Sequence, residues 1–284
     1  MNKTVKPLIE RAIKSGAKLG YTELDSPIDF NLIEPNLLRA IEKRMGFFAE
    51  NVNENTAKLL NDAIDDHLAL RNKPEFKKVG GFHPSYTNQC ARYWHYLFEG
   101  QEVTPSFRSQ TYRIFDNGHA VHERLYGYLR EMGILVAEEI PVKHTSPPIE
   151  GTADGIIDWY GHKLIELKSI SAEGFQYRQF HNKPKDDHYR QAQIYMRCLD
   201  LPSGYVIYEN KNNQEILPIF IERDDVFIDK LFTKYNKIYT NFLEGELPKQ
   251  PYKRSSAKCA QCDLAAMCWG EGEFSKTTEV EEPF

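Results

Sequence analysis

Apolar residues recur with a helical period in the first part of the chain and with mixed periods after it. Over residues 37–48 and again over 59–70, apolar residues recur at helical spacing, which predicts two amphipathic helices. From Val79 onward, glycine and proline interrupt the pattern, and both helical and extended segments are expected. The predicted divisions are an N-terminal helical region (1–78), a main domain (79–270) and a tail (271–284).

The main domain is predicted to alternate helices and strands. The predicted elements, in chain order, are a helix over 112–132, strands over 134–142, 151–160 and 163–170, a polar loop over 171–187, a helix over 187–199, strands over 204–209 and 215–221, and a helix over 225–243. Three strands, a helix and two more strands require a mixed sheet with helices on its faces. The predicted class is therefore α/β (α+β).

Composition agrees with a folded protein. The 284 residues are 41% hydrophobic and 12% aromatic, which is typical of a globular chain. No apolar run approaches the roughly 18 residues that span a membrane. Residues 1–21 are basic and amphipathic but lack the apolar core and cleavage site of a secretory signal. We expect a cytoplasmic protein, in the host cell if its source is viral, with no membrane partner.

The charge is unevenly distributed. The formal net charge is −5, and the tail from Glu271 to Phe284 holds five glutamates and one lysine, so the rest of the chain is close to neutral. We expect this tail to be disordered. Basic residues gather in three clusters, namely Arg71, Lys73, Lys77 and Lys78, then Arg92, Arg108 and Arg113, then Lys183, Lys185 and Arg190. Such clusters either bind phosphate or form an ordinary solvated surface.

Two neighbouring extended segments carry two acids and a lysine. The first contains Asp154, and the second contains Glu166 and Lys168, whose side chains point to one face because strand residues alternate. If the segments pair as a hairpin, Asp154 meets Glu166 and Lys168 at one end of a sheet. Two carboxylates beside an ammonium group suit a divalent metal ion that acts on a phosphate. The alternative is a surface hairpin with an ordinary ion pair.

The hairpin resembles the signature of the PD-(D/E)XK nucleases, and its context is similar to the RecB-like branch. Ala153 stands where the family name has proline, a departure that leaves the ligand at Asp154 intact. The resemblance implies a restriction-endonuclease-like fold in which Asp154, Glu166 and Lys168 are catalytic and the two acids bind Mg²⁺ or Mn²⁺. Asp158, about 13 Å further along the strand at ~3.3 Å per residue, is the rival ligand.

A histidine on the preceding helix fits the same resemblance. His122 follows Gly118 by four residues, which matches the family's Gly-x-x-x-His motif and selects His122 over His119. The resemblance implies that His122 binds the metal ion, with the backbone carbonyl of Leu167 as a further ligand. The alternative for His122 is a partly buried core histidine.

The helix after the third strand carries a second motif. His188, Gln191 and Tyr195 stand one turn apart and share a face. They form either a polar stripe on an exposed helix or, by resemblance to the family's Gln-x-x-x-Tyr motif, a substrate contact made by Gln191 and Tyr195 near the metal site.

The cysteines have the spacing of a metal site. Cys259, Cys262 and Cys268 follow the pattern Cys-x2-Cys-x5-Cys, and in a cytosolic chain structural disulfides are not expected. Cys90 is the natural fourth ligand, while Cys198 is better explained as a buried core thiol. The spacing alone leaves both zinc and an iron–sulfur cluster open.

One distant cysteine followed by this triplet resembles the iron–sulfur branch of the nuclease superfamily, which includes the CRISPR-adaptation exonucleases and the AddB nuclease domain. The resemblance implies a 4Fe–4S cluster, with Zn²⁺ as the alternative, that joins the segment before the nuclease core to the segment after it. The aromatic residues near the cysteines either stack on bases or pack in the core; they are Tyr93, Trp94, Tyr96 and Trp269.

These features together predict a metal-dependent DNA nuclease. The resemblance implies an exonuclease on single-stranded DNA ends that serves recombination, repair, phage DNA processing or CRISPR adaptation, with recombination or replication proteins as partners. One alternative is a non-catalytic DNA-binding partner in a recombination complex. Another is a zinc-stabilised RNA-binding or scaffold protein, in which Glu166 and Lys168 form a surface pair.

Overall fold

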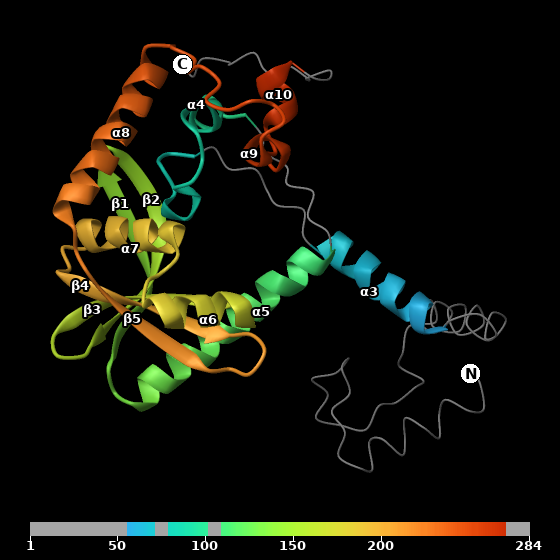
Figure 1. The fold of residues 1–284 in the computed structure, drawn as a ribbon, viewed down its shortest axis with the longest axis vertical. Coiled ribbons are helices and arrows are strands. Elements are labelled where there is room, and N and C mark those ends of the chain that lie inside the picture. The colour runs from blue at the N-terminus through green and yellow to red at the C-terminus, as the bar shows by residue number, and fades with distance from the viewer. Residues whose placement is uncertain (1–55, 72–78, 102–108, 271–284) are drawn as a thin grey trace, which may run out of the picture. The chain divides into compact units, whose positions relative to one another are not determined.

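The chain divides into two compact units, Met1–Arg71 and Asn72–Phe284. The computed structural model describes residues 56–71, 79–101 and 109–270 (Figure 1). In the first unit it describes helix α3 (Thr56–Arg71), on which Leu68 is buried. This helix contains the second helical run expected from the sequence. The helix expected over 37–48 and the acidic tail lie outside the described residues.

A five-stranded mixed sheet in the order β1-β2-β3-β4-β5 forms the centre of the second unit. The strands are β1 (Leu135–Thr145), β2 (Pro148–Asp158), β3 (His162–Ile170), β4 (Ser203–Asn210) and β5 (Ile216–Glu222). All neighbours pair antiparallel except β3 and β4, which pair parallel. A parallel pair needs a crossover, which α6 (Ala172–His181) and α7 (Asp186–Cys198) supply. The predicted mixed sheet is confirmed.

Helices cover both faces of this sheet, and strand β3 contributes to both cores. Ile165 and Leu167 pack against α5 (Ser109–Glu131), whereas Leu164 packs in the cluster that contains most of the buried apolar residues of α7. Successive strand residues point to opposite faces, so Glu166 shares the α7 face with Leu164. This explains the unbroken apolar run around Glu166, because a strand covered on both faces needs apolar residues on both.

A third apolar cluster joins the segment before the sheet to the segment after it. Its helices are α4 (Ala91–Glu99) and α8 (Asp225–Leu243), and the short helices α9 (Ala257–Ala260) and α10 (Ala265–Trp269) follow them. Trp94 of α4 is completely buried, and Phe82 stacks on Tyr235 with ring centroids 4.2 Å apart. Leu264, between the two short helices, belongs to the same cluster. The described segments before and after the sheet therefore share one core.

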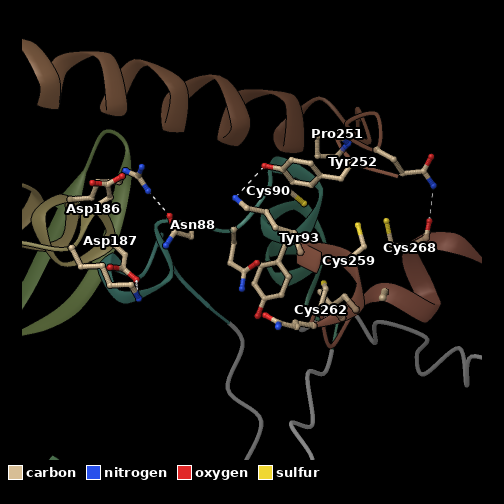
Figure 2. A pocket seen from close by; sticks show the side chains of 18 of the residues that line it. Asn88, Cys90, Tyr93, Asp186, Asp187, Pro251, Tyr252, Cys259, Cys262 and Cys268 are labelled. Carbon is tan, nitrogen blue, oxygen red and sulfur yellow. Dashed lines mark hydrogen bonds and ion pairs between the residues drawn. The ribbon is translucent and has the colours of Figure 1, made fainter. Parts of the chain in front are cut away.

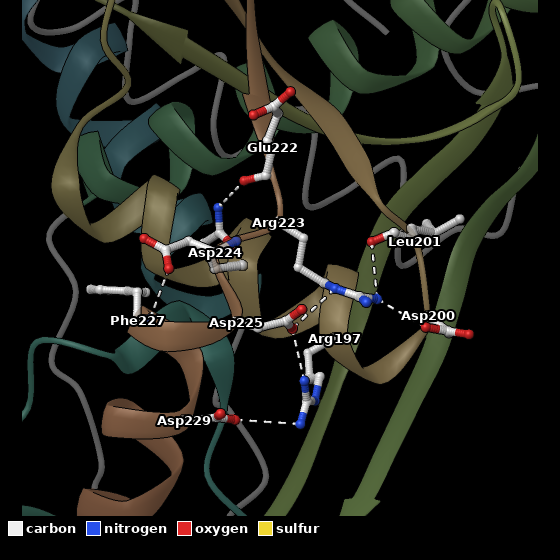
Figure 3. A network of polar contacts seen from close by, with 10 residues as sticks. Arg197, Asp200, Leu201, Glu222, Arg223, Asp224, Asp225, Phe227 and Asp229 are labelled. Atoms are coloured by element: carbon white, nitrogen blue, oxygen red, sulfur yellow. Dashed lines mark hydrogen bonds and ion pairs between the residues drawn. The ribbon is translucent and has the colours of Figure 1, made fainter.

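The position of α7 is fixed by polar contacts at its C-terminal half (Figure 3). The buried Gln193 side chain donates to the Glu222 carbonyl at 2.7 Å and accepts from the Asp224 amide at 2.8 Å. Arg197 adds an ion pair with Asp225 at 2.7 Å. These contacts hold α7 against the connection between β5 and α8, and α7 carries the Gln-x-x-x-Tyr motif.

The loop expected over 171–187 is partly wrong, because it contains helix α6. Only one residue of this helix, Phe175, is fully buried, so the sequence lacks the apolar period that would reveal it. The helix instead begins with a cap, in which Ser171 accepts a hydrogen bond from the Gly174 amide at 3.3 Å. It ends at Asn182, which adopts the left-handed conformation.

The other predicted boundaries in the second unit agree with the structure within three residues, and the helix expected over 225–243 coincides with α8. None of the helices in the described ranges is long and apolar enough to cross a membrane.

Candidate functional site

The two acids and the lysine meet where strands β2 and β3 separate. The ladder between these strands runs from the pair Asp158 and His162 to the pair Gly155 and Ile165, and there it ends. Beyond it, the Leu167 amide donates to the Asp154 carboxylate at 2.6 Å in place of a backbone carbonyl. Asp158, the rival ligand, is exposed at the other end of the hairpin.

Glu166 is a buried acid with an unsatisfied oxygen. Its side chain has no exposed surface, one carboxylate oxygen forms an ion pair with Lys168, and Oε2 has no hydrogen-bond partner among the described residues. Burial raises the pKa of Glu166 and the Asp154 carboxylate raises it further, against the opposing effect of Lys168. A buried carboxylate oxygen without a hydrogen-bond partner destabilises the folded state unless a ligand binds to it.

Lys168 connects this buried acid to the surface, since 24% of its side chain is exposed. Burial by itself would lower the pKa of Lys168, but the carboxylates of Glu166 and Asp154 outweigh it and raise that pKa. The lysine therefore stays protonated at neutral pH and carries its charge to the rim of the site.

His122 reaches the same strand from the opposite face of the sheet. Its Nε2 lies 3.1 Å from the Leu167 carbonyl oxygen, to which a ring protonated at Nε2 donates. Leu167 therefore links two predicted ligands, with its amide on Asp154 and its carbonyl at His122. His119, the other histidine of this motif, is exposed. The structure thus brings His122, Asp154, Glu166 and Leu167 together.

The Gln-x-x-x-Tyr motif lies on the buried side of α7. Gln191 is almost fully buried, and Tyr195 has no exposed surface. Burial raises the pKa of Tyr195, and the nearby carboxylates of Glu166 and Asp154 raise it further. His188, one turn before Gln191, lies with Nδ1 2.9 Å from the Tyr208 hydroxyl. The motif is therefore buried near the acid pair, and its tyrosine is closed to solvent.

Two further tyrosines belong to the site and were not identified from the sequence. Tyr126, one helical turn after His122, donates to the Asp154 backbone carbonyl at 2.8 Å. Tyr208 stands opposite Lys168 in the parallel ladder and accepts a hydrogen bond from the Lys185 amide at 2.9 Å. The i+4 spacing from His122 could have indicated Tyr126, whereas the pairing of β3 with β4 alone reveals Tyr208.

Four cysteines from two distant segments line one cavity of about 1060 Å³ (Figure 2). Cys90 precedes α4, Cys259 lies on α9, Cys262 lies between the short helices and Cys268 lies on α10. All are free thiols. Cys198, on α7, is not among the residues that line this cavity.

The cysteines are close enough to affect one another's ionisation. Burial raises the pKa of Cys262, and Cys90 and Cys259 add to this effect. Burial also raises the pKa of Cys268, against an opposing effect of Arg92. In the described part of the chain, no three His, Cys, Asp or Glu side chains stand close enough to hold a metal ion as they are now arranged, and this applies to His122, Asp154 and Glu166 as well as to the cysteines.

The aromatic residues near the cysteines divide into two kinds. Trp94 is fully buried and packs edge-on against Phe82, so it belongs to the core. Tyr93 and Tyr96 are also largely buried but line the cavity, together with the partly exposed Trp269.

No protein-family model and no curated protein matches this chain. Among solved structures it is similar to one described as SSO0001, at 20% identity over 77% of this chain and 97% of that one, with a TM-score of 0.45. It is also similar to an alkaline exonuclease (LHK-Exo) from Laribacter hongkongensis, at 18% identity over 64% of this chain and 94% of that one, with a TM-score of 0.44. The same exonuclease in complex with dAMP matches 60% of this chain at a TM-score of 0.44.

Proposed function

We propose that this protein is a divalent-metal-dependent deoxyribonuclease of the RecB-like PD-(D/E)XK type, acting as an exonuclease on single-stranded DNA ends. The observation that carries the proposal is the buried Glu166 carboxylate, which keeps an unpaired oxygen beside Asp154 and Lys168. A purely structural ion pair would satisfy both oxygens, because an unpaired buried acceptor destabilises the fold.

The donor atoms at this site suit a hard cation. Asp154 and Glu166 offer carboxylate oxygens and Leu167 a backbone carbonyl, which are the donors that Mg²⁺ and Mn²⁺ prefer, and His122 adds an imidazole. When bound, such an ion supplies Lewis-acid stabilisation of the phosphate charge and lowers the pKa of coordinated water. Burial raises the pKa of Glu166, and repulsion from Asp154 raises it further; a bound cation would relieve this repulsion.

The remaining roles belong to side chains of this chain. Lys168, protonated and partly exposed, orients the attacking water and offsets negative charge as the phosphodiester breaks. Tyr126 holds the Asp154 backbone through its carbonyl. Gln191 and Tyr195 support the acids from α7, and a substrate contact by Tyr195 would require it to become exposed.

For the cysteines we propose a 4Fe–4S cluster held by Cys90, Cys259, Cys262 and Cys268. Two observations support it, namely the common cavity and the single core shared by Trp94 and the C-terminal segment. A link between residues as far apart as Cys90 and Cys259 could stabilise the fold by about 5 kcal/mol, by analogy with a disulfide across a long loop. Zn²⁺ is the alternative occupant.

The test is digestion of end-labelled single- and double-stranded DNA by protein purified without oxygen. We expect hydrolysis that requires Mg²⁺ or Mn²⁺, stops with EDTA, shortens linear single strands progressively and spares circular single strands. Lys168→Ala is the matched inactive control. Absence of metal-dependent hydrolysis on all substrates would overturn the nuclease and favour a non-catalytic DNA-binding protein. A colourless preparation with stoichiometric zinc would overturn the iron–sulfur cluster.

A further inference from the structure

The cavity that holds the cysteines extends to the connection between α6 and α7. There it is lined by Tyr177 and Arg178 of α6 and by Lys183 and Lys185 of the connection. The cysteines account for one end of the cavity, while this end contributes cations and an exposed aromatic ring. It adjoins the first turn of α7, where Asp186 and Asp187 also line the cavity (Figure 2).

Two cation–tyrosine pairs from different segments line this one cavity. On α6, the Arg178 guanidinium lies 4.4 Å from the centroid of the Tyr177 ring. In the C-terminal segment, Lys258 Nζ lies 5.2 Å from the Tyr252 ring centroid and 3.3 Å from its hydroxyl. Tyr177 is 53% exposed and Tyr252 is 38% exposed, so each residue keeps accessible surface, and the His181 ring also contacts Tyr177 with centroids 4.2 Å apart. An aromatic surface with a cation beside it is the arrangement that binds a base and its phosphate together.

The α6–α7 connection is held firmly enough to present its lysines. Arg178 donates to the Pro184 carbonyl at 3.2 Å, and the Lys185 amide donates to the Tyr208 hydroxyl at 2.9 Å. Tyr208 stands opposite Lys168 on the neighbouring strand. The connection is therefore tied to the strand pair that carries the catalytic lysine. Lys185 Nζ is paired with Asp187 at 2.8 Å, which leaves Lys183 as the better phosphate contact.

We infer that this cavity binds a single strand of DNA that leads towards the Asp154–Glu166 site, an inference that rests on the proposed nuclease function. Bases stack on Tyr177 and Tyr252, while Lys183 contacts the phosphate backbone. The occupant is single-stranded because paired bases keep their faces within the duplex, where neither ring could reach them. The charge agrees, since Arg178, Lys183 and Lys258 line the same space.

The test measures binding without hydrolysis, by fluorescence anisotropy of a labelled single-stranded oligonucleotide in EDTA. Tyr177→Leu and Tyr252→Leu should each weaken binding by roughly 5- to 150-fold. Lys183→Ala should reduce the slope of log K against log salt by about 0.7. The controls are Phe180→Leu, an exposed aromatic of α6 outside the cavity, and Lys230→Ala, an exposed lysine of α8, which should leave affinity unchanged.

The outcomes separate this inference from the proposed function. Affinity that survives both tyrosine substitutions, or wild-type protein that prefers duplex DNA or single-stranded RNA, would overturn the inference whether or not the protein cleaves DNA. Loss of binding in the tyrosine variants but not in Phe180→Leu supports it, even if hydrolysis is absent and the proposed nuclease fails. Visible absorbance, recorded for each variant, shows that a loss of affinity does not come from a disrupted cysteine site.

Discussion

Asp154 is predicted to have two separable roles, and replacing it with asparagine or alanine distinguishes them. Its carboxylate accepts the buried Leu167 amide at 2.6 Å, where the β2–β3 ladder ends. The same carboxylate is a proposed metal ligand. Asparagine keeps an oxygen that can accept the amide but removes the negative charge, whereas alanine removes both.

The stability difference follows from that hydrogen bond. Removing a charged acceptor from a buried amide costs about 2 kcal/mol, within the usual range for an orphaned donor. In a domain of this size, that corresponds to a melting temperature about 4–8 °C lower for Asp154→Ala. Asp154→Asn should melt near the wild-type temperature or above it, because it removes the carboxylate that helps to raise the pKa of Glu166.

Activity should not follow stability. Both variants lose the ligand charge, so both should lose at least about 100-fold in Mg²⁺-dependent hydrolysis of labelled single-stranded DNA. Calorimetry of the metal-free proteins measures the melting temperatures of the two variants, so that stability can be compared with activity. Full activity in Asp154→Asn would refute the ligand role, and equal melting temperatures for the two variants would refute the structural role of the Leu167 hydrogen bond.

Three further predictions concern the lysine, the cysteines and a partly buried histidine. Lys168→Ala should abolish hydrolysis but still bind DNA, as measured by fluorescence anisotropy in EDTA. Hydrolysis at the wild-type rate would contradict the role of Lys168. Cys262→Ala should lose visible absorbance and several degrees of melting temperature together, whereas Cys198→Ala should keep the absorbance because Cys198 lies outside the cavity. Burial lowers the pKa of His188 from 6.5 to about 4, so between these pH values the unfolded chain binds more protons than the folded one. The free energy of unfolding that depends on His188 is therefore complete above about pH 6.5 and falls towards pH 4, by up to about 1.4 kcal/mol per pH unit. His188→Gln should flatten that loss in urea titrations, and an unchanged pH profile would contradict the assignment.

Periodicity was sufficient for most of the elements. Strand alternation around Glu166 and the helical spacing of α8 are local properties, so they are readable from neighbouring residues. Helix α6 was missed for the same reason, since with only Phe175 fully buried its helical state depends on its caps and not on an apolar stripe.

The residues proposed for the candidate site could be chosen from the sequence, because the choice depends on which residue types stand at which spacing. Asp154, Glu166, Lys168 and His122 were identified in that way, and the structure brings them together around Leu167. Spacing could not reveal that Leu167 connects His122 to Asp154, because that geometry depends on where two strands separate.

Only the tertiary structure determines which side chains are buried and which distant side chains come together. The sequence allowed the face of Gln191 and Tyr195 to be an exposed polar stripe, and the packing of α7 on the sheet closes it. Likewise, the sequence named Cys90 as partner of the C-terminal cysteines, but the cavity that they share with Tyr177 joins three segments far apart in the chain. Local spacing determines which side chains a strand or helix presents on each face. Long-range packing determines which of these side chains come together and which are removed from water. Removal from water raises the pKa of Glu166 and favours its ion pair with Lys168.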